Sequence, residues 1–230
     1  MATRKVRFYA SVAEFLEEYI FHNDACAIFL VVCSTRHHFL EKLFVAVQTP
    51  TRTDDSCKEH EHGNHRLLTN TIGSLAKSSR IKLVFCPTVE SLRAYISGSH
   101  MTFPSEMTTS IVQRDSRPVL AILDLLALHH KTPEFSAQGL SRTLASLVEA
   151  AARETADLVL SECADVTYHA DGETGQALWH ADVPLLRGLV QTGEGDDNTC
   201  MGPGVPVRRV VRRWFDFDEN SRIKTISTDV

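Results

Sequence analysis

The sequence predicts an α/β protein in which helices flank a parallel β-sheet. Short apolar runs of strand length alternate along the chain with segments whose apolar residues recur at helical spacing. These runs are Cys26–Cys33, Ile81–Cys86, Val119–Leu123 and Leu158–Leu160. Continuous apolar runs are typical of strands that are buried on both faces, as in a parallel sheet. Strands that alternate with helices form βαβ units with right-handed crossovers.

The composition is that of an ordinary globular chain. It has 230 residues, of which 43% are hydrophobic and 23% are charged, and this length is at the upper end for one domain. We therefore expect a single domain over residues 1–230. The net charge of −5 excludes a protein that is basic all over, so any binding of nucleic acid has to use a local patch. The apolar runs are too short to span a bilayer, and the scattered cysteines fit a reducing, intracellular compartment.

Three segments are expected within this domain: an amino-terminal helix over 1–24, a βα core over 25–162, and a carboxyl-terminal strand pair with a tail over 163–230. The first helix begins with Ser11 and Glu14, which have the spacing of a capping box. In the last segment, Trp179–Val190 and Val205–Phe217 are predicted strands joined by a Gly-rich acidic loop. With no helix between them, they should form an antiparallel extension.

The turn after the first apolar run is where nucleotide-binding α/β proteins carry a glycine-rich phosphate loop. Here the turn reads Cys33-Ser-Thr-Arg-His-His38 and contains no glycine. Side chains with a Cβ atom obstruct the positive-φ conformations that such a loop uses. We therefore interpret Ser34, Thr35 and Arg36 as a capped surface turn at a degenerate nucleotide position, although Arg36 is also placed to meet an anion at the helix start.

Acidic residues close two of the predicted strands. Asp124 ends one apolar run at the position where ATPases of this architecture hold Mg²⁺, and Glu162 closes the next strand. Without a phosphate loop, Asp124 is interpreted as a remnant or a structural cap. Glu162 is interpreted in the same way. The sequence offers no convincing Ser/His/Asp or Cys/His arrangement. We expect no catalytic residue, no nucleotide site and no cofactor, so the chain is predicted not to be an enzyme.

Two segments are rich in histidine. The stretch Cys57–His65 has metal-like ligand types at close spacing, but zinc needs four ligands fixed in a tetrahedron and no Cys-x-x-Cys accompanies it. We predict a solvated loop there and no metal site. The pair His129 and His130 follows the Asp124 run and either senses a ligand at the sheet edge or has a loop or packing role. The loop or packing role is the favoured interpretation.

One segment concentrates basic and aromatic residues. It holds four arginines that are followed by two aromatic residues, namely Arg208, Arg209, Arg212, Arg213, Trp214 and Phe215. Arginine beside aromatic rings suits phosphate contact and base stacking, so the four arginines are the candidate DNA-binding residues. If the segment is a strand, Arg209 and Arg213 face one side and the other two arginines face the opposite side. The alternative is a solvated edge strand paired with nearby acidic residues.

The order of these motifs resembles the core of RecA-fold recombinases and their paralogs. The resemblance is carried by Val119–Asp124, Ser136–Arg142, Leu158–Glu162 and Gln176–Arg187, the last of which is similar to a recombinase strand with Trp, His and a Leu-rich ending with Arg. It covers about residues 25–217 and implies a RecA-like parallel sheet. The phosphate loop is missing, and only about twenty-five residues precede the first core strand, too few for a recombinase amino-terminal helical domain.

A core-only paralog that has lost its ATP site is similar to a fungal subunit of the Shu complex, which assists the recombinase on DNA. The resemblance implies a nuclear, non-catalytic subunit in homologous recombination DNA repair that binds single-stranded or forked DNA and no membrane. Its partner would be a recombinase paralog or a protein with a SWIM domain. Two alternatives stay open. One is a subunit of another inactive RecA-fold assembly, Elongator-like and tRNA-binding, and the other is a divergent ATPase completed by a partner.

Overall fold

The computed structural model describes residues 2–23, 25, 27–48, 65–69, 71–98, 117–130, 132–163, 175–186 and 204–218. At its centre is a six-stranded sheet in the order β3-β2-β4-β5-β1-β8. Its strands are β1 (Arg4–Val6), β2 (Ile28–Val32), β3 (Ile81–Phe85), β4 (Val119–Leu123), β5 (Asp157–Ser161) and β8 (Asp216–Phe217). Neighbouring strands of this sheet pair in parallel, which confirms the α/β fold class.

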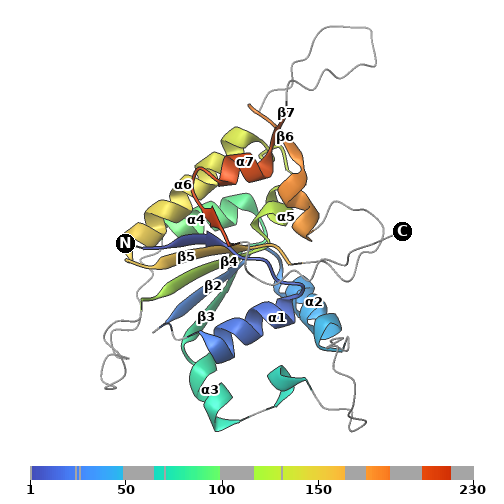
Figure 1. Cartoon of the computed structure of the whole chain (residues 1–230), viewed down its shortest axis with the longest axis vertical. Helices are drawn as coiled ribbons and strands as arrows, with labels where there is room; N and C mark the ends of the chain where they lie inside the picture. The colour runs from blue at the N-terminus through green and yellow to red at the C-terminus, as the bar shows by residue number, and fades with distance from the viewer. Residues whose placement is uncertain are drawn as a thin grey trace, which may run out of the picture.

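Helices cover both faces of the sheet. These helices are α1 (Val12–Glu17) with its π-helical continuation η1 (Glu18–His22), α2 (Arg36–Gln48), α4 (Val89–Gly98), α5 (Leu125–His130), α6 (Ala137–Arg153), η4 (Gly175–His180) and α7 (Val207–Val211). Two further short helices, η2 (Arg66–Leu68) and α3 (Ile72–Ser78), have no buried side chain. Figure 1 shows α1 and α2 on one side and α4, α5, α6 and α7 on the other. Strand β4 contributes to both layers, because Leu120 and Ile122 belong to the core cluster that holds α6, whereas Ala121 and Leu123 belong to the cluster that holds α1.

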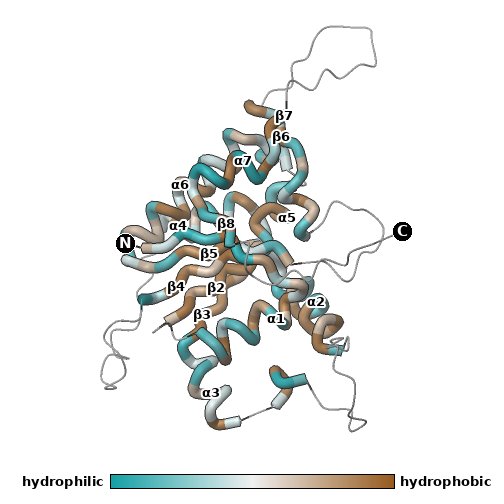
Figure 2. The backbone as a smooth tube through the Cα atoms, viewed as in Figure 1, coloured by the Kyte–Doolittle hydropathy of each residue, from teal (hydrophilic) through white to brown (hydrophobic). Residues whose placement is uncertain are grey.

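The central strands are hydrophobic along their whole length. Every residue of β2 and of β4 is buried, and Figure 2 shows the hydrophobic middle of the sheet. Because helices cover both faces, the strands need no alternation of apolar and polar residues, as the sequence predicted. In the described part of the chain, no helix is long and apolar enough to cross a bilayer.

The amino-terminal segment corrects the prediction of a helix over residues 1–24, because a strand precedes the helix. In β1 only Val6 is fully buried, and the strand is defined by its pairing, which places Arg4 opposite Leu158 of β5. Three residues with one buried side chain carry no periodicity that a sequence argument can detect. The predicted helix start is confirmed, since Ser11 Oγ accepts a hydrogen bond from Glu14 N–H at 3.2 Å.

The carboxyl-terminal segment confirms one expectation and corrects two. An antiparallel pair is present, formed by β6 (Asp182–Pro184) and β7 (Gly204–Pro206). The strand expected from Trp179 onward instead begins with the 3₁₀ helix η4, and residues 187–190 lie outside the described residues. The strand expected over Val205–Phe217 is interrupted by helix α7. The physical reason is the spacing of three buried valines, Val207, Val210 and Val211, which is helical rather than alternating.

Candidate functional site

The candidate site lies at the carboxyl ends of β2, β4 and β5. Helix α2 leaves β2 on one face of the sheet, whereas α5 leaves the neighbouring strand β4 on the opposite face (Figure 1). In open α/β sheets, the crevice at such a topological switch point is the usual place for ligands. The predicted positions 34–36 and 124 meet here, because Cys33 N–H donates to Leu123 O at 2.9 Å.

Asp124 is the centre of this site. It follows β4 in the left-handed backbone region, with φ of 62°, and is 2% exposed. Its Oδ2 lies 3.2 Å from Nζ of Lys42 on α2, and its Oδ1 accepts a hydrogen bond from Cys163 N–H at 3.1 Å. The two side chains are 6% and 4% exposed, so Lys42 and Asp124 form a buried ion pair. A pair of this kind is costly to break, since the remaining charge is left in the protein interior.

Glu162 adds a second carboxyl group to the site. It follows β5, is buried, and accepts hydrogen bonds from the N–H groups of Leu126 at 2.5 Å and Ala127 at 3.3 Å, in the first turn of α5. Burial raises the pKa of the Glu162 carboxyl well above its ordinary value, and the charge of Asp124 raises this pKa further. The site therefore holds one fixed ion pair beside a carboxyl group that binds its proton tightly.

The turn between β2 and α2 has the predicted character of a capped surface turn. Thr35 Oγ1 accepts a hydrogen bond from His38 N–H at 3.2 Å, which satisfies one of the free donors of the first turn of α2. Ser34 Oγ donates to Thr35 O at 3.3 Å. Thr35 and Arg36 are exposed, so Arg36 points no charge into the interior and remains available to an anion at the surface.

Sequence reasoning missed Lys42, because the apolar pattern of α2 includes Leu40 and Phe44, which the structure leaves 46% and 63% exposed. Phe39, Leu43 and Ala46 form the inward side of α2, and Lys42 falls between them at helical spacing. A lysine at an inward position needs a counter-charge, because burial of an unpaired ammonium is unfavourable. Asp124 was the acidic residue that the sequence placed at the end of the neighbouring strand.

The arginine segment forms helix α7 and a following turn, so the prediction of a strand is wrong. Arg208 lies in α7 and Arg212 is the residue that caps its end, so these two arginines share a side of the segment. The guanidinium groups of Arg208 and Arg212 lie 4.9 and 5.6 Å from the ring centre of Phe217. Arg209 and Arg213 are exposed. Arg212 is exposed as well, so the two pairs differ in their contact with Phe217 and not in their exposure.

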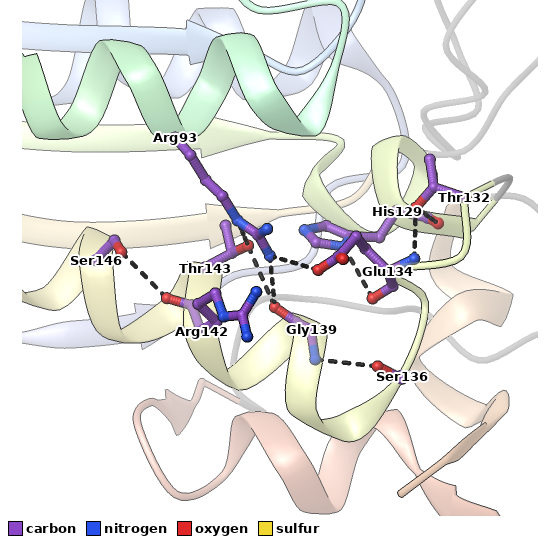
Figure 3. Close-up of polar contacts among 9 residues, drawn as sticks. All are labelled: Arg93, His129, Thr132, Glu134, Ser136, Gly139, Arg142, Thr143 and Ser146. Atoms are coloured by element: carbon purple, nitrogen blue, oxygen red, sulfur yellow. Dashed lines mark hydrogen bonds and ion pairs between the residues drawn. The ribbon is translucent and has the colours of Figure 1, made fainter. Parts of the chain in front are cut away.

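His129 has a packing role. Its ring is fully buried, with Nδ1 3.3 Å from Glu134 O, and burial lowers its pKa to about 4. Beside it, Arg93 of α4 donates to Glu134 Oε2, Thr143 Oγ1 and Gly139 O, each at 3.0 Å. Figure 3 shows this cluster, which joins α4 to the start of α6. The His130 ring packs 5.1 Å from the Phe135 ring.

The histidine-rich stretch Cys57–His65 lies outside the described residues except for its last member. His65 caps η2, since its Nδ1 accepts a hydrogen bond from Leu67 N–H at 3.3 Å. Within the described ranges, no group of three or more His, Cys, Asp or Glu side chains is arranged to hold a metal ion.

Comparison with known proteins gives one family. No curated protein matches this chain. A family model with a fungal name matches residues 5–167, a span that contains Lys42, Asp124 and Glu162 but ends before the arginines of α7. Because this span is well over half of the sequence, the chain belongs to the SPAC22G7.03-like family.

Proposed function

We propose that this protein is a non-catalytic subunit of a recombinase-paralog complex that assists homologous recombination in DNA repair. The observation that carries the proposal is the buried ion pair of Lys42 and Asp124 at the strand ends. Metal-dependent phosphoryl transfer needs a carboxylate that Mg²⁺ can reach together with its waters. Here one Asp124 oxygen faces the Lys42 ammonium, the other accepts from Cys163 N–H, and the side chain is 4% exposed.

The protein therefore supplies its own cation to this carboxylate. Lys42 comes from α2, Asp124 from the end of β4, and Cys163 follows β5. The ion pair and the backbone hydrogen bond connect these three elements, so the role of Asp124 is to hold them together. In this account Asp124 holds the elements at the sheet end together and does not hold Mg²⁺.

The RecA-like part of the proposal is supported by the placement of the motif residues. Asp124 and Glu162 end neighbouring parallel strands, and the turn at 34–36 ends the strand on the other side of β4. This juxtaposition is what the resemblance to recombinase paralogs requires. The fungal name of the family is compatible with the fungal relative that the resemblance implies.

In this proposal, Arg209 and Arg213 contact the DNA backbone. Both are exposed, and arginine guanidinium groups bind phosphates with paired donors. Arg208 and Arg212 instead hold Phe217, which packs 5.4 Å from the ring of Trp179. We assign the complex to the nucleus, with single-stranded or forked DNA as ligand and a recombinase paralog or SWIM-domain protein as partner.

The test is a salt titration of single-stranded DNA binding, made with the partner present. We expect Arg209→Ala with Arg213→Ala to lower both the affinity and the dependence of log K on log salt, because each phosphate contact releases condensed counterions. The slope should fall by about 0.7 for each single-strand phosphate contact that is lost.

The matched control is Arg208→Ala with Arg212→Ala, which removes the same charge from the same segment. This variant should lower the thermal stability, since the cation–π contacts with Phe217 are lost, and should keep most of the salt slope. Equal slopes for wild type and both variants, with folding intact, would assign all four arginines to other roles and remove the DNA contact from α7.

A further inference from the structure

Residues 65–69 and 71–80, here called the 65–80 arm, form two short helices that bury none of their side chains. Three large apolar residues of the arm face solvent: Leu68 is 58% exposed, Ile72 88% and Leu75 61%. Figure 1 shows α3 at one end of the molecule, beyond β3 and α1. A helix as short as α3 is marginal in water and normally gains its stability by packing an apolar face.

The arm is held to the domain by polar and cationic contacts. Lys77 Nζ donates to Phe21 O at 3.0 Å, Arg80 donates to Ala25 O at 3.1 Å, and the Arg66 guanidinium lies 4.0 Å from the ring centre of Phe21. These contacts fix the inward side of the arm. The apolar side chains are left on the outer side, where only another molecule or segment can cover them.

The charge of this region differs from that of the chain. Residues 65–89 contain Arg66, Lys77, Arg80 and Lys82 and no Asp or Glu, whereas the whole chain has a net charge of −5. Between η1 and the arm lies a pocket of about 370 Å³, lined by Phe21, Arg66 and Lys77 together with the hydroxyl-bearing Thr69, Thr71 and Ser74. The Ser74 hydroxyl donates within the arm, to Thr71 O at 2.9 Å, so the two cations are the groups that this pocket offers to a carboxylate.

We infer that the 65–80 arm binds an acidic amphipathic segment of a partner protein. The partner's apolar side chains cover Leu68, Ile72 and Leu75, and one of its carboxylates enters the pocket beside Arg66 and Lys77. Apolar contact supplies most of the affinity, and the charge complementarity selects an acidic partner. Exposed aliphatic residues do not stack on bases, so a nucleic acid fits this surface less well.

Binding of a partner at the arm does not depend on the proposed role at DNA, and it is tested without DNA or nucleotide. The full chain is titrated into a fluorescent synthetic peptide with leucines at helical spacing and glutamates at the other positions. The matched peptide carries lysine in place of glutamate. We expect saturable binding of the acidic peptide, weaker binding at high salt, and no binding of the basic peptide.

Variants of the protein locate the binding surface. Ile72→Glu with Leu75→Glu should weaken binding of the acidic peptide by at least about tenfold, and Arg66→Gln should reduce its salt dependence. Leu186→Glu is the matched control, since Leu186 is 66% exposed and lies outside the arm. Circular dichroism should show the wild-type fold for the leucine and isoleucine variants, because the altered side chains are exposed. Arg66→Gln also removes the contact with Phe21, so its thermal stability is measured alongside its binding.

Three results would overturn the inference: no saturable binding up to about 1 mM peptide, equal binding of the two peptides, or wild-type affinity in the Ile72→Glu, Leu75→Glu variant. A photo-crosslinker at position 72 of the full chain adds an independent check. When the acidic peptide is present, it should be the molecule that becomes crosslinked to position 72. A crosslink to residues 49–64 of the same chain, or to a second copy, would show that the surface has another occupant.

Discussion

Lys42 and Asp124 lie 82 residues apart in the sequence and form a single buried contact, with Nζ 3.2 Å from Oδ2. The pair joins α2 to the end of β4, and Asp124 extends the connection to Cys163 through a backbone hydrogen bond. The side chains of Lys42 and Asp124 are 6% and 4% exposed, so water solvates neither charge well. Each charge is therefore stabilised by the other.

Replacement of Lys42 by methionine should destabilise the fold strongly. The change leaves the Asp124 carboxylate buried without its cation, and the expected loss in the free energy of unfolding is about 3–5 kcal/mol. Urea unfolding followed by circular dichroism measures it. Lys42→Met with Asp124→Asn should recover part of the loss, because the pair is removed together. Lys82→Met at an exposed position is the control. A Lys42→Met variant as stable as this control would contradict a structural role for the pair.

His129 should make the stability depend on pH in acid. Its pKa is about 4 in the folded protein and about 6.5 in an unfolded chain. Between these values the unfolded chain binds more protons, so the free energy of unfolding falls as the pH drops from about 6.5 to 4 and is fully regained above that window. The size of this contribution is about 3 kcal/mol.

The comparison of two variants isolates this contribution. His129→Gln should flatten the pH dependence of the unfolding free energy between pH ~4 and ~6.5, whereas His180→Gln, at an exposed position, should keep the wild-type slope. The raised pKa of Glu162 is common to all three proteins and cancels in the comparison. If His129→Gln retains the full wild-type slope, the buried ring is not the group that titrates.

Gly139 should tolerate no side chain. A Cβ atom at this position would collide with the carbonyl oxygen of Glu134, in the segment that also holds the Arg93 cluster. Gly139→Ala should therefore lower the free energy of unfolding by roughly 2 kcal/mol or more. The matched change is Gly98→Ala, where the added methyl group meets nothing within 4 Å and a small stabilisation is expected. Equal stability of the two variants would mean that the loop before α6 moves away freely.

The sequence predicts a strand well where every residue of that strand is buried. Strands β2 and β4 are buried at every residue, so their apolar runs identified them, and the acidic residues that end β4 and β5 were found as candidates for the same reason. The parallel strands then bring these ends together. The capping residues of α1 were equally clear, because a cap depends on neighbours within the same turn.

The remaining elements depend on distant partners. Strands β1 and β8 have three and two residues and exist through their pairing with each other and with β5. The sequence predicts a strand where the structure has helix α7, since a run of arginines and valines fits both periods. The burial of Val207, Val210 and Val211 decides for the helix. Lys42 became a site residue only when the fold placed Asp124 beside it.

The most direct test of the central claim is isothermal titration of the purified full chain with ATP and Mg²⁺. With the Asp124 carboxylate neutralised by Lys42 and no glycine in the turn at 33–38, we expect no saturable heat of binding up to about 1 mM ATP and no release of phosphate. Saturable binding at micromolar ATP, accompanied by Mg²⁺-dependent hydrolysis, would contradict the account and identify the sheet end as a working nucleotide site.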